Sequence, residues 1–374
     1  MTTGRMLFSP AGQRAVGRAG RHVAIVAWRD IASPRAGGSE LMVDQLAVGL
    51  TEMGDRVSLL CGGPSAPHPY RVVRGGGPYT QFLGAPVAYA RRLRDCDVIV
   101  EVCNGMPFLT PLWSRKPTIC MVNHVHADLW PLRFPPPVST VGRFLERRVM
   151  PWAHRGNLML TVSESTARGL ESLGVPRDRI RMLTNGVAPA GPPAPRSAEP
   201  LFLALGRLTE YKRIDLLLRL WERVRPVTGG RLVIAGDGPE RPRLEPLAGD
   251  GVLFAGRISD ERKHRLMSAA WLLLHPALIE GWGLVVSEAA LRGTPAIGFD
   301  VPGLRDSVEH GRTGLLARSE SEFASAWATL ALSPARRAAL GEAARKRASR
   351  LSWPVAVRHF SAVLDEAIGT GAAR

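Results

Sequence analysis

Short apolar runs and amphipathic stretches alternate along the first half of the chain. The apolar runs predict buried strands, at 22–28, 56–61, 97–102, 117–125 and 157–163. The amphipathic stretches between them predict helices, at 39–53, 79–95, 141–153 and 164–173. Strands that are apolar on both faces are typical of a parallel sheet with helices packed on both sides.

The same alternation resumes after a proline-rich segment. Residues 187–200 contain five prolines, a composition that disfavours helix and strand and predicts an extended linker. Beyond the linker, strands are expected at 201–206, 231–236, 252–256, 271–275 and 295–299. Helices are expected at 214–224, 260–270, 284–292, 320–331, 334–349 and 353–367.

We therefore predict an α/β protein with two Rossmann-like, doubly wound parallel-sheet domains that face each other across a cleft. The expected parts are a loose basic tail at 1–21, a first domain at 22–186, the linker at 187–200, a second domain at 201–351 and a terminal helix at 352–374. Because ligands bind at the carboxyl ends of parallel strands, we expect the site between the two domains.

The charge of the chain is unusual. Its 374 residues include 49 basic and 33 acidic ones, a net charge of +16, and residues 1–186 hold 23 of the basic and 13 of the acidic ones. Such a field attracts phosphates, whether on a nucleotide-linked substrate, a membrane surface or a nucleic acid. No apolar run is long enough to span a membrane and no secretion signal is evident, so we expect a cytoplasmic protein.

Three segments carry candidate chemistry, each just after a predicted strand. The segment 35–40, RAGGSE, opens a helix, where glycines and free backbone N–H groups suit an anion. The segment 206–215, GRLTEYKRID, supplies Arg207 and Lys212, two cations suited to a diphosphate. The segment 280–288, EGWGLVVSE, supplies two carboxylates, one in a glycine-rich turn and one in the next helix. Taken singly, the first two also fit a plain turn and solvated surface charge.

Taken together, the segments resemble a known family. With NGV at 185–187, AGDGPE at 235–240, FAGRIS at 254–259 and PAIGFDVPGLRDSV at 295–308, they are similar to the retaining GT-B glycosyltransferases that include bacterial mannosyl- and glucosyltransferases. The resemblance covers nearly the whole chain, and the E-x7-E spacing is its most specific part. It implies transfer of a hexose from a UDP- or GDP-linked sugar to a hydroxyl of a glycan, glycolipid or other acceptor. It also implies that the last helix crosses back to the first domain.

The resemblance implies roles for individual residues. Glu288 would accept hydrogen bonds from the ribose, Glu280 would face the hydroxyls of the transferred sugar, and Arg207 with Lys212 would neutralise the diphosphate. Further donor-lining residues would be Gly37 and Gly38 in a closing loop, Arg257 and Ile258 at the base, and Gly281, Trp282, Gly283, Leu284 and Val285 beside sugar and phosphate.

A histidine placed over the sugar is also implied by the resemblance. The segment after the predicted strand at 117–125 offers Asn123, His124 and His126, of which we assign His124 to the catalytic set with Arg207, Lys212 and Glu280. A purely structural histidine at a polar strand end is the alternative.

No metal or other cofactor is predicted beside the nucleotide sugar. Two fixed cations can stabilise the charge on a leaving diphosphate in place of a metal ion. Asp95 and Asp97 imitate the D-x-D motif of metal-dependent glycosyltransferases, but they fall at the amino end of the predicted sheet, where ligands do not bind. The four cysteines have no C-x-x-C pair, which argues against a zinc site.

Two other interpretations remain. The chain could be a basic protein that binds polyanions or membrane surfaces and has an inactive cleft, or a GT-B epimerase or phosphorylase. An inactive cleft would not need the four charged residues named above. We expect no nucleic-acid partner, but the arginine-rich segments 90–95 and 143–155 could dock anionic lipid or a lipid-phosphate acceptor at the inner face of the membrane. The segment 143–155 equally fits an ordinary core-facing helix.

Overall fold

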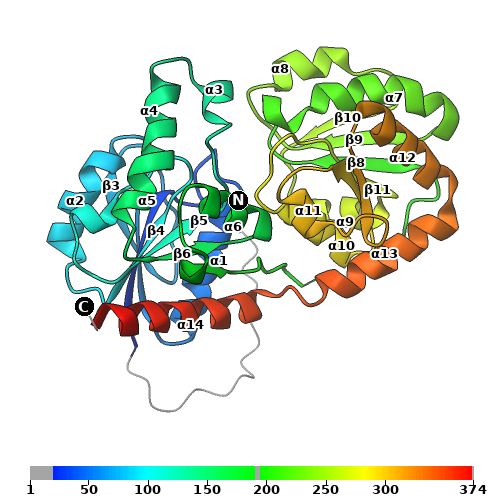
Figure 1. Cartoon of the computed structure of the whole chain (residues 1–374). Helices are drawn as coiled ribbons and strands as arrows, with labels where there is room; N and C mark the ends of the chain where they lie inside the picture. The colour runs from blue at the N-terminus through cyan, green and yellow to red at the C-terminus, as the bar shows by residue number, and fades with distance from the viewer. Residues whose placement is uncertain (1–19, 190–193, 373–374) are drawn as a thin grey trace.

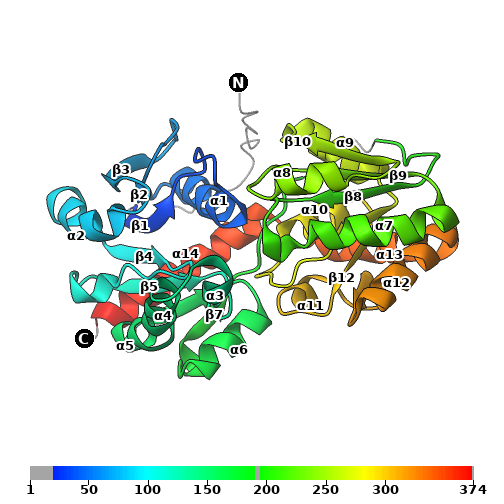
Figure 2. The same ribbon diagram turned by 90° about the horizontal axis from the view of Figure 1, so that it is seen from above.

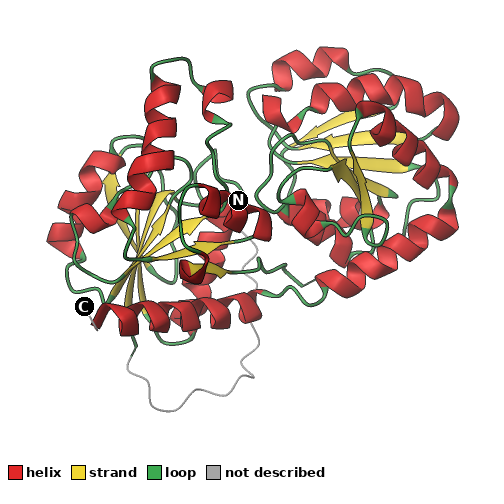
Figure 3. Ribbon diagram, viewed as in Figure 1, coloured by secondary structure: helices red, strands yellow, loops and turns green. Residues whose placement is uncertain are grey.

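The computed structural model describes residues 20–189 and 194–372. Most of the expected basic tail, and residues 190–193 of the expected linker, lie outside this part of the chain. The described residues form two α/β units, each a parallel sheet between layers of helices (Figures 1 and 3). The expected fold class is therefore correct.

The first sheet has seven strands in the order β3-β2-β1-β4-β5-β6-β7. The strands are β1 (His22–Arg29), β2 (Arg56–Gly62), β3 (Arg71–Gly76), β4 (Val98–Val102), β5 (Thr118–Val122), β6 (Leu158–Thr161) and β7 (Ile180–Met182). The helices are α1 (Gly38–Glu52), α2 (Gln81–Arg92), α3 (Trp130–Arg133), α4 (Val138–Phe144), the π-helix η2 (Leu145–Val149), α5 (Met150–Ala153) and α6 (Glu164–Ser172). Parallel pairing aligns Val23 of β1 with Val57 of β2 and with Val98 of β4.

The second sheet has six strands in the order β10-β9-β8-β11-β12-β13. The strands are β8 (Leu201–Leu205), β9 (Arg231–Ala235), β10 (Val252–Gly256), β11 (Leu272–His275), β12 (Ala296–Phe299) and β13 (Gly314–Ala317). The helices are α7 (Ile214–Thr228), α8 (Arg241–Leu244), α9 (Asp260–Ala269), α10 (Leu284–Leu291), α11 (Leu304–Ser307), α12 (Glu320–Leu332), α13 (Pro334–Ala348) and α14 (Trp353–Ala372). Trp221 and Trp327 stack on each other in this domain's core, and Phe202 packs edge-on against both.

Several expected elements differ from the observed ones. The strands β3, β7 and β13 lie at sheet edges and were not expected. Exposed positions interrupt the apolar pattern of β3 and β7, and β13 is only four residues long. The single helix expected at 141–153 starts at Val138 and contains the π-helical turn η2 between α4 and α5. Helix α7 continues through Pro226 to Thr228, beyond the expected end at 224.

The last helix, α14, crosses from the second domain to the first and lies along its lower face (Figures 1 and 2). Trp353 and Phe360 join the hydrophobic core of the first domain. Helix α14 meets α1 at Gly49, where a Cβ atom would lie 2.4 Å from Val357 Cγ2. A glycine at this crossing therefore allows the two helices to pack closely.

Candidate functional site

The two domains contact each other through the loops that follow their strands. Arg257, after β10, donates a hydrogen bond of 2.5 Å to the carbonyl of Pro34 in the loop after β1. Arg207, after β8, donates to the carbonyl of Arg35 in the same loop, at 3.3 Å. The carboxyl ends of both sheets therefore meet, and this is the place where doubly wound domains bind ligands.

Glycines allow these loops to approach one another closely. A Cβ atom on Gly281 would lie 2.4 Å from the carbonyl oxygen of Asn123, and one on Gly38 would lie 3.0 Å from Leu284 Cδ1. Gly37 lies beside the guanidinium of Arg207, with 3.6 Å between its Cβ position and Nη2. Gly37, Gly38 and Gly281 thus lie at contacts between the loops of the two domains.

The Glu280 carboxylate binds two basic side chains. Lys212 Nζ lies 2.5 Å from Glu280 Oε2, and the ring of His275, at the end of β11, lies 3.0 Å from the same oxygen. Burial alone raises the pKa of Glu280, but Lys212 and His275 outweigh it and hold that pKa well below the usual range. Burial, together with Lys212, lowers the pKa of His275. Glu280 is therefore an anion beside a neutral imidazole at neutral pH.

The second carboxylate, Glu288, lies one turn into α10. Gly283 begins this helix with a φ of 82°, a conformation that a glycine adopts without strain. The Glu288 side chain is largely buried and accepts a hydrogen bond of 2.9 Å from Lys263 of α9. The two acids of the E-x7-E pair therefore have separate cationic partners.

Three polar residues after β5 were candidates for the place over the sugar. The Asn123 side chain donates to Ser39 Oγ within the first domain, at 2.9 Å. The ring of His126 bonds the carbonyl of His124 at 2.8 Å, and its backbone N–H donates to Glu146. His124 is half-buried beside Gly281, and its pKa is lowered to about 4 by burial, against the opposing charge of Glu280. Its ring is therefore neutral at neutral pH.

The remaining predicted donor-lining residues occupy different positions. Arg257 is exposed and bonded to Pro34 as above, whereas Ile258 and Val285 pack against the core of the second domain. Trp282 is buried, packs with the core of the first domain and donates from its indole to Ser287 Oγ. The Trp282 side chain therefore links the two domains.

Two contacts to the paired acids were missed in the sequence. The contact of His275 could have been suspected from the sequence, because His275 is the polar residue at the end of an otherwise apolar strand. Nothing in the sequence indicates the contact of Lys263, because its contact with Glu288 depends on how α9 packs beside α10.

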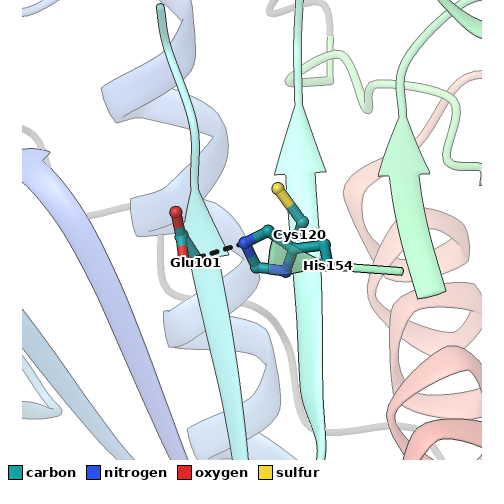
Figure 4. A group of neighbouring side chains, drawn as sticks. All are labelled: Glu101, Cys120 and His154. Carbon is teal, nitrogen blue, oxygen red and sulfur yellow. Dashed lines mark ion pairs between the residues drawn. The ribbon is translucent and has the colours of Figure 1, made fainter. Parts of the chain in front are cut away.

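Glu101, Cys120 and His154 form a buried cluster of residue types that can bind a metal (Figure 4). The Glu101 carboxylate already accepts hydrogen bonds from the backbone N–H groups of Phe108, Leu109 and Thr110 and from the Thr110 hydroxyl. Burial raises the pKa of Glu101, but His154 and these donors bring it down to about 2. The donors use the four acceptor positions of a carboxylate, so this cluster is suited to holding the loop after β4 rather than a metal.

Asp95 and Asp97 lie at the amino end of the first sheet. Asp95 forms an ion pair with Arg56 at the start of β2, and Asp97 accepts a hydrogen bond from the backbone N–H of His22 at the start of β1. Both carboxylates are therefore bound to the end of the sheet opposite the domain interface.

Two doubly wound domains with cations and carboxylates in their facing loops define a class of enzymes that hold a nucleotide-linked ligand between domains. Two family models match this chain: "Glycosyltransferase Family 4" over residues 36–190 and "Glycosyl transferases group 1" over residues 192–347. The chain belongs to this glycosyltransferase family and has its GT-B fold, which confirms the resemblance found in the sequence.

Curated relatives support the family at moderate identity. An uncharacterized glycosyltransferase of Methanocaldococcus jannaschii is 27% identical over 190 residues, which cover 45% of this chain and 49% of that one. A D-inositol 3-phosphate glycosyltransferase of Kribbella flavida is 30% identical over 267 residues, which cover 64% and 62%. The chain spans about half the length of the first curated relatives it matches.

Solved structures match the fold over nearly the whole chain. Sucrose-phosphate synthase from Thermosynechococcus elongatus has a TM-score of 0.80 at 21% identity, covering 92% of this chain and 98% of that one. HepE of Anabaena, in complex with UDP-glucose, has a TM-score of 0.75 at 18% identity, covering 92% and 100%. In the described part of the present chain, no helix is long and apolar enough to cross a membrane.

Proposed function

We propose that this chain is a retaining, metal-independent hexosyltransferase. It takes the sugar from a UDP- or GDP-linked donor and transfers it to a hydroxyl of a glycan, glycolipid or other acceptor during cell-envelope glycan or polysaccharide synthesis. The observation that carries the proposal is the contact between Lys212 and Glu280 at the carboxyl ends of the second sheet, with Arg207 in the loop after β8 and Glu288 in the first turns of α10. An inactive cleft would have no use for this set.

The cations account for the departure of the diphosphate. Cleavage of the bond between sugar and diphosphate leaves negative charge on the phosphate oxygens. Lys212 has three N–H donors and gives one to Glu280, so two remain for phosphate. Arg207 adds a planar fork of donors that matches phosphate geometry. Because both cations are fixed before the reaction, they stabilise the developing charge without a metal ion.

The remaining groups orient the sugar and the nucleoside. Glu280 is held by Lys212 and His275, so its carboxylate can accept hydrogen bonds from sugar hydroxyls in a fixed direction. His124, a neutral imidazole near Glu280 and Gly281, can exchange hydrogen bonds with the same sugar. Glu288 accepts the ribose hydroxyls. Front-face attack requires no carboxylate nucleophile, and the family implies that route.

UDP-glucose is the first donor to test, because the similar HepE structure holds it. We would measure thermal stabilisation and donor hydrolysis with UDP-, GDP- and ADP-sugars in EDTA, for the wild type, Glu288→Ala and Arg207→Ala. Stabilisation by one nucleotide class, reduced in both variants, is expected. No response of the wild type to any donor would contradict the proposal and favour the polyanion-binding alternative. Free sugar phosphate as the product would favour a phosphorylase.

We further propose that α4 brings the enzyme to an anionic membrane that supplies a lipid-linked acceptor. Val138, Val141 and Phe144 of α4 are exposed, Phe144 to 59%, although apolar side chains of a helix are normally buried. Arg147 and Arg148 follow on the exposed surface of η2. Apolar side chains beside cations suit a surface of anionic lipid. This exposure favours the docking interpretation over the core-facing one.

Co-sedimentation with phosphatidylglycerol vesicles tests this part of the proposal. Binding at low salt, weakened by Phe144→Ser and by high salt, is expected because both apolar and ionic contacts contribute. Leu253→Ser, at an exposed apolar position of β10 in the second domain, is the matched control and should bind like the wild type. Equal binding by Phe144→Ser and the control would contradict membrane docking through α4.

A further inference from the structure

The contact between Lys263 and Glu288 joins two helices of the second domain. Lys263 Nζ lies 2.9 Å from Glu288 Oε1, and the two side chains are 17% and 11% exposed. Lys263 Nζ also lies 3.0 Å from Asp260 of the same helix, whose side chain is 80% exposed. The pair with Glu288 is therefore largely shielded from water, whereas the pair with Asp260 is a surface contact that contributes little.

The pair is ionic in the folded protein. Burial by itself lowers the pKa of Lys263, but the nearby charges of Glu288 and Asp260 outweigh it and raise that pKa. A carboxylate offers about four acceptor positions, and Lys263 uses one of them on Oε1. The remaining positions can accept two ribose hydroxyls, and such charge-assisted hydrogen bonds are stronger than neutral ones.

Lys263 also follows directly from the loop expected at the nucleobase. Strand β10 ends at Gly256, Arg257 and Ile258 follow, and Ser259 caps α9 by accepting a hydrogen bond from the backbone N–H of Arg262. Lys263 therefore lies on the first turn of α9, at a fixed distance from the Arg257–Ile258 loop. Lys263 therefore connects the helix that follows this loop to the Glu288 carboxylate.

We infer that Lys263 is a positioning residue for the ribose of the donor: it holds the Glu288 carboxylate in the orientation that accepts the 2′- and 3′-hydroxyls and balances its charge. The inference rests on the proposed function, because it assumes a nucleotide-sugar donor. Lys263 acts through Glu288, so its loss should weaken recognition of the ribose hydroxyls and leave recognition of the diphosphate by Arg207 and Lys212 unaffected.

The experiment compares nucleotides with and without ribose hydroxyls. Dissociation constants are measured calorimetrically for UDP, GDP and their 2′,3′-dideoxy analogues. For the wild type, the dideoxy analogue of the preferred nucleotide should bind about 10- to 100-fold more weakly, since hydrogen bonds to a charged group are lost. For Lys263→Met, the two forms should bind within about threefold of each other. A merely structural effect would weaken both forms equally and leave their ratio unchanged.

Two further variants secure the result. Lys263→Arg keeps the charge and should retain the preference for the ribonucleotide. Lys263→Gln keeps a hydrogen-bond donor but removes the charge, and it should lose the preference for the ribonucleotide. It therefore provides the same test if Lys263→Met does not fold. Lys346→Met, the same substitution at an exposed position of α13, is the matched control and should behave like the wild type.

The failures of the two proposals are distinguishable. Suppose that the wild type prefers the ribonucleotide, and that both Lys263→Met and Lys263→Gln keep the same preference. In that case the inference about Lys263 is wrong and the proposed function stands. If the wild type binds neither UDP nor GDP, the proposed function is wrong and the role of Lys263 falls with it.

Discussion

The ammonium of Lys212 lies 2.5 Å from Glu280 Oε2, so the cation that we assign to the diphosphate is bonded to the acid that we assign to the sugar. The two residues come from different segments, Lys212 from the turn before α7 and Glu280 from the turn before α10. One hydrogen-bonded pair therefore connects the two groups that we assign to the two sides of the bond to be broken.

Loss of Lys212 should impair turnover strongly. Lys212→Met removes one of two fixed cations and leaves the Glu280 anion with His275 alone, so we expect donor hydrolysis and transfer to fall by roughly 10²–10³. Arg219→Ala, at an exposed arginine of α7, is the control and should retain wild-type rates.

A double-mutant cycle tests the contact itself. Because Lys212 and Glu280 touch, the effects of Lys212→Met and Glu280→Gln on kcat/KM should not add. Strictly additive effects would show that the two residues act independently.

The contact between domains should be sensitive to one methyl group. In Gly281→Ala the new Cβ would lie 2.4 Å from the Asn123 carbonyl oxygen, which is backbone and cannot rotate away. We expect the loops to separate and transfer to fall at least tenfold, while each domain keeps its fold. Small-angle scattering should report a more open molecule.

Gly249→Ala is the matched control for Gly281→Ala. No heavy atom lies within 4 Å of its Cβ position, so activity and shape should not change. If Gly281→Ala transferred sugar at the wild-type rate, close contact between these loops would not be required for activity.

Glu146, in the π-helical turn η2, should make stability depend on pH. It is buried, and it accepts hydrogen bonds from the His126 backbone and the Trp130 indole. Burial raises its pKa to about 7, with a smaller contribution from Asp128, against the lowering effects of these hydrogen bonds and of Arg147. The folded protein therefore keeps a proton that the unfolded chain releases above about pH 4.3.

The sign of this effect follows from linkage. Between about pH 4.3 and 7 the folded state binds more protons than the unfolded state, so this contribution to stability falls as the pH rises through that range. Glu146→Gln cannot titrate, and its melting temperature should decline less between pH 5 and 7 than that of the wild type. Parallel melting curves for the two proteins would contradict the raised pKa.

The central strands of both sheets and the edge strand β10 could be predicted from the sequence, whereas the edge strands β3, β7 and β13 could not. Strands such as β4, VIVEV, are buried along their whole length, so a continuous apolar run marks them. The edge strand β3, RVVRGG, has several exposed positions and ends in glycines, so its pattern is that of a loop. β3 therefore lacks the continuous apolar run that marks the buried strands.

For the candidate site, the residues could be predicted from the sequence, but the contacts between them could not. Glu280, Glu288, Arg207 and Lys212 could be found because each lies at a fixed place in a strand–turn–helix segment. Which cation binds which acid could not be predicted, because it depends on side-chain packing between segments far apart in the sequence. Lys263 and Glu288 are 25 positions apart and meet only because α9 and α10 lie side by side.

The terminal helix α14 should be part of the fold of the first domain. Phe360 is fully buried in that domain's core, and Arg21, which is paired with Asp55, donates a hydrogen bond to the backbone of α14 at Ser361. We expect Phe360→Ala to reduce the free energy of unfolding by about 3–5 kcal/mol, the usual cost of emptying a buried phenylalanine site. Val355→Ala, at an exposed position of the same helix, should change it by less than about 0.5 kcal/mol.

Truncation after Leu351 extends the test from one side chain to the whole helix. The first domain would lose Trp353 and Phe360 from its core and expose the face of α1 that α14 covers. Calorimetry should then show a lower melting temperature, and because α14 also ties the second domain to the first, the two domains should no longer unfold together. An unchanged melting temperature would mean that α14 adds nothing to the fold and that its buried contacts with α1 are not made in solution.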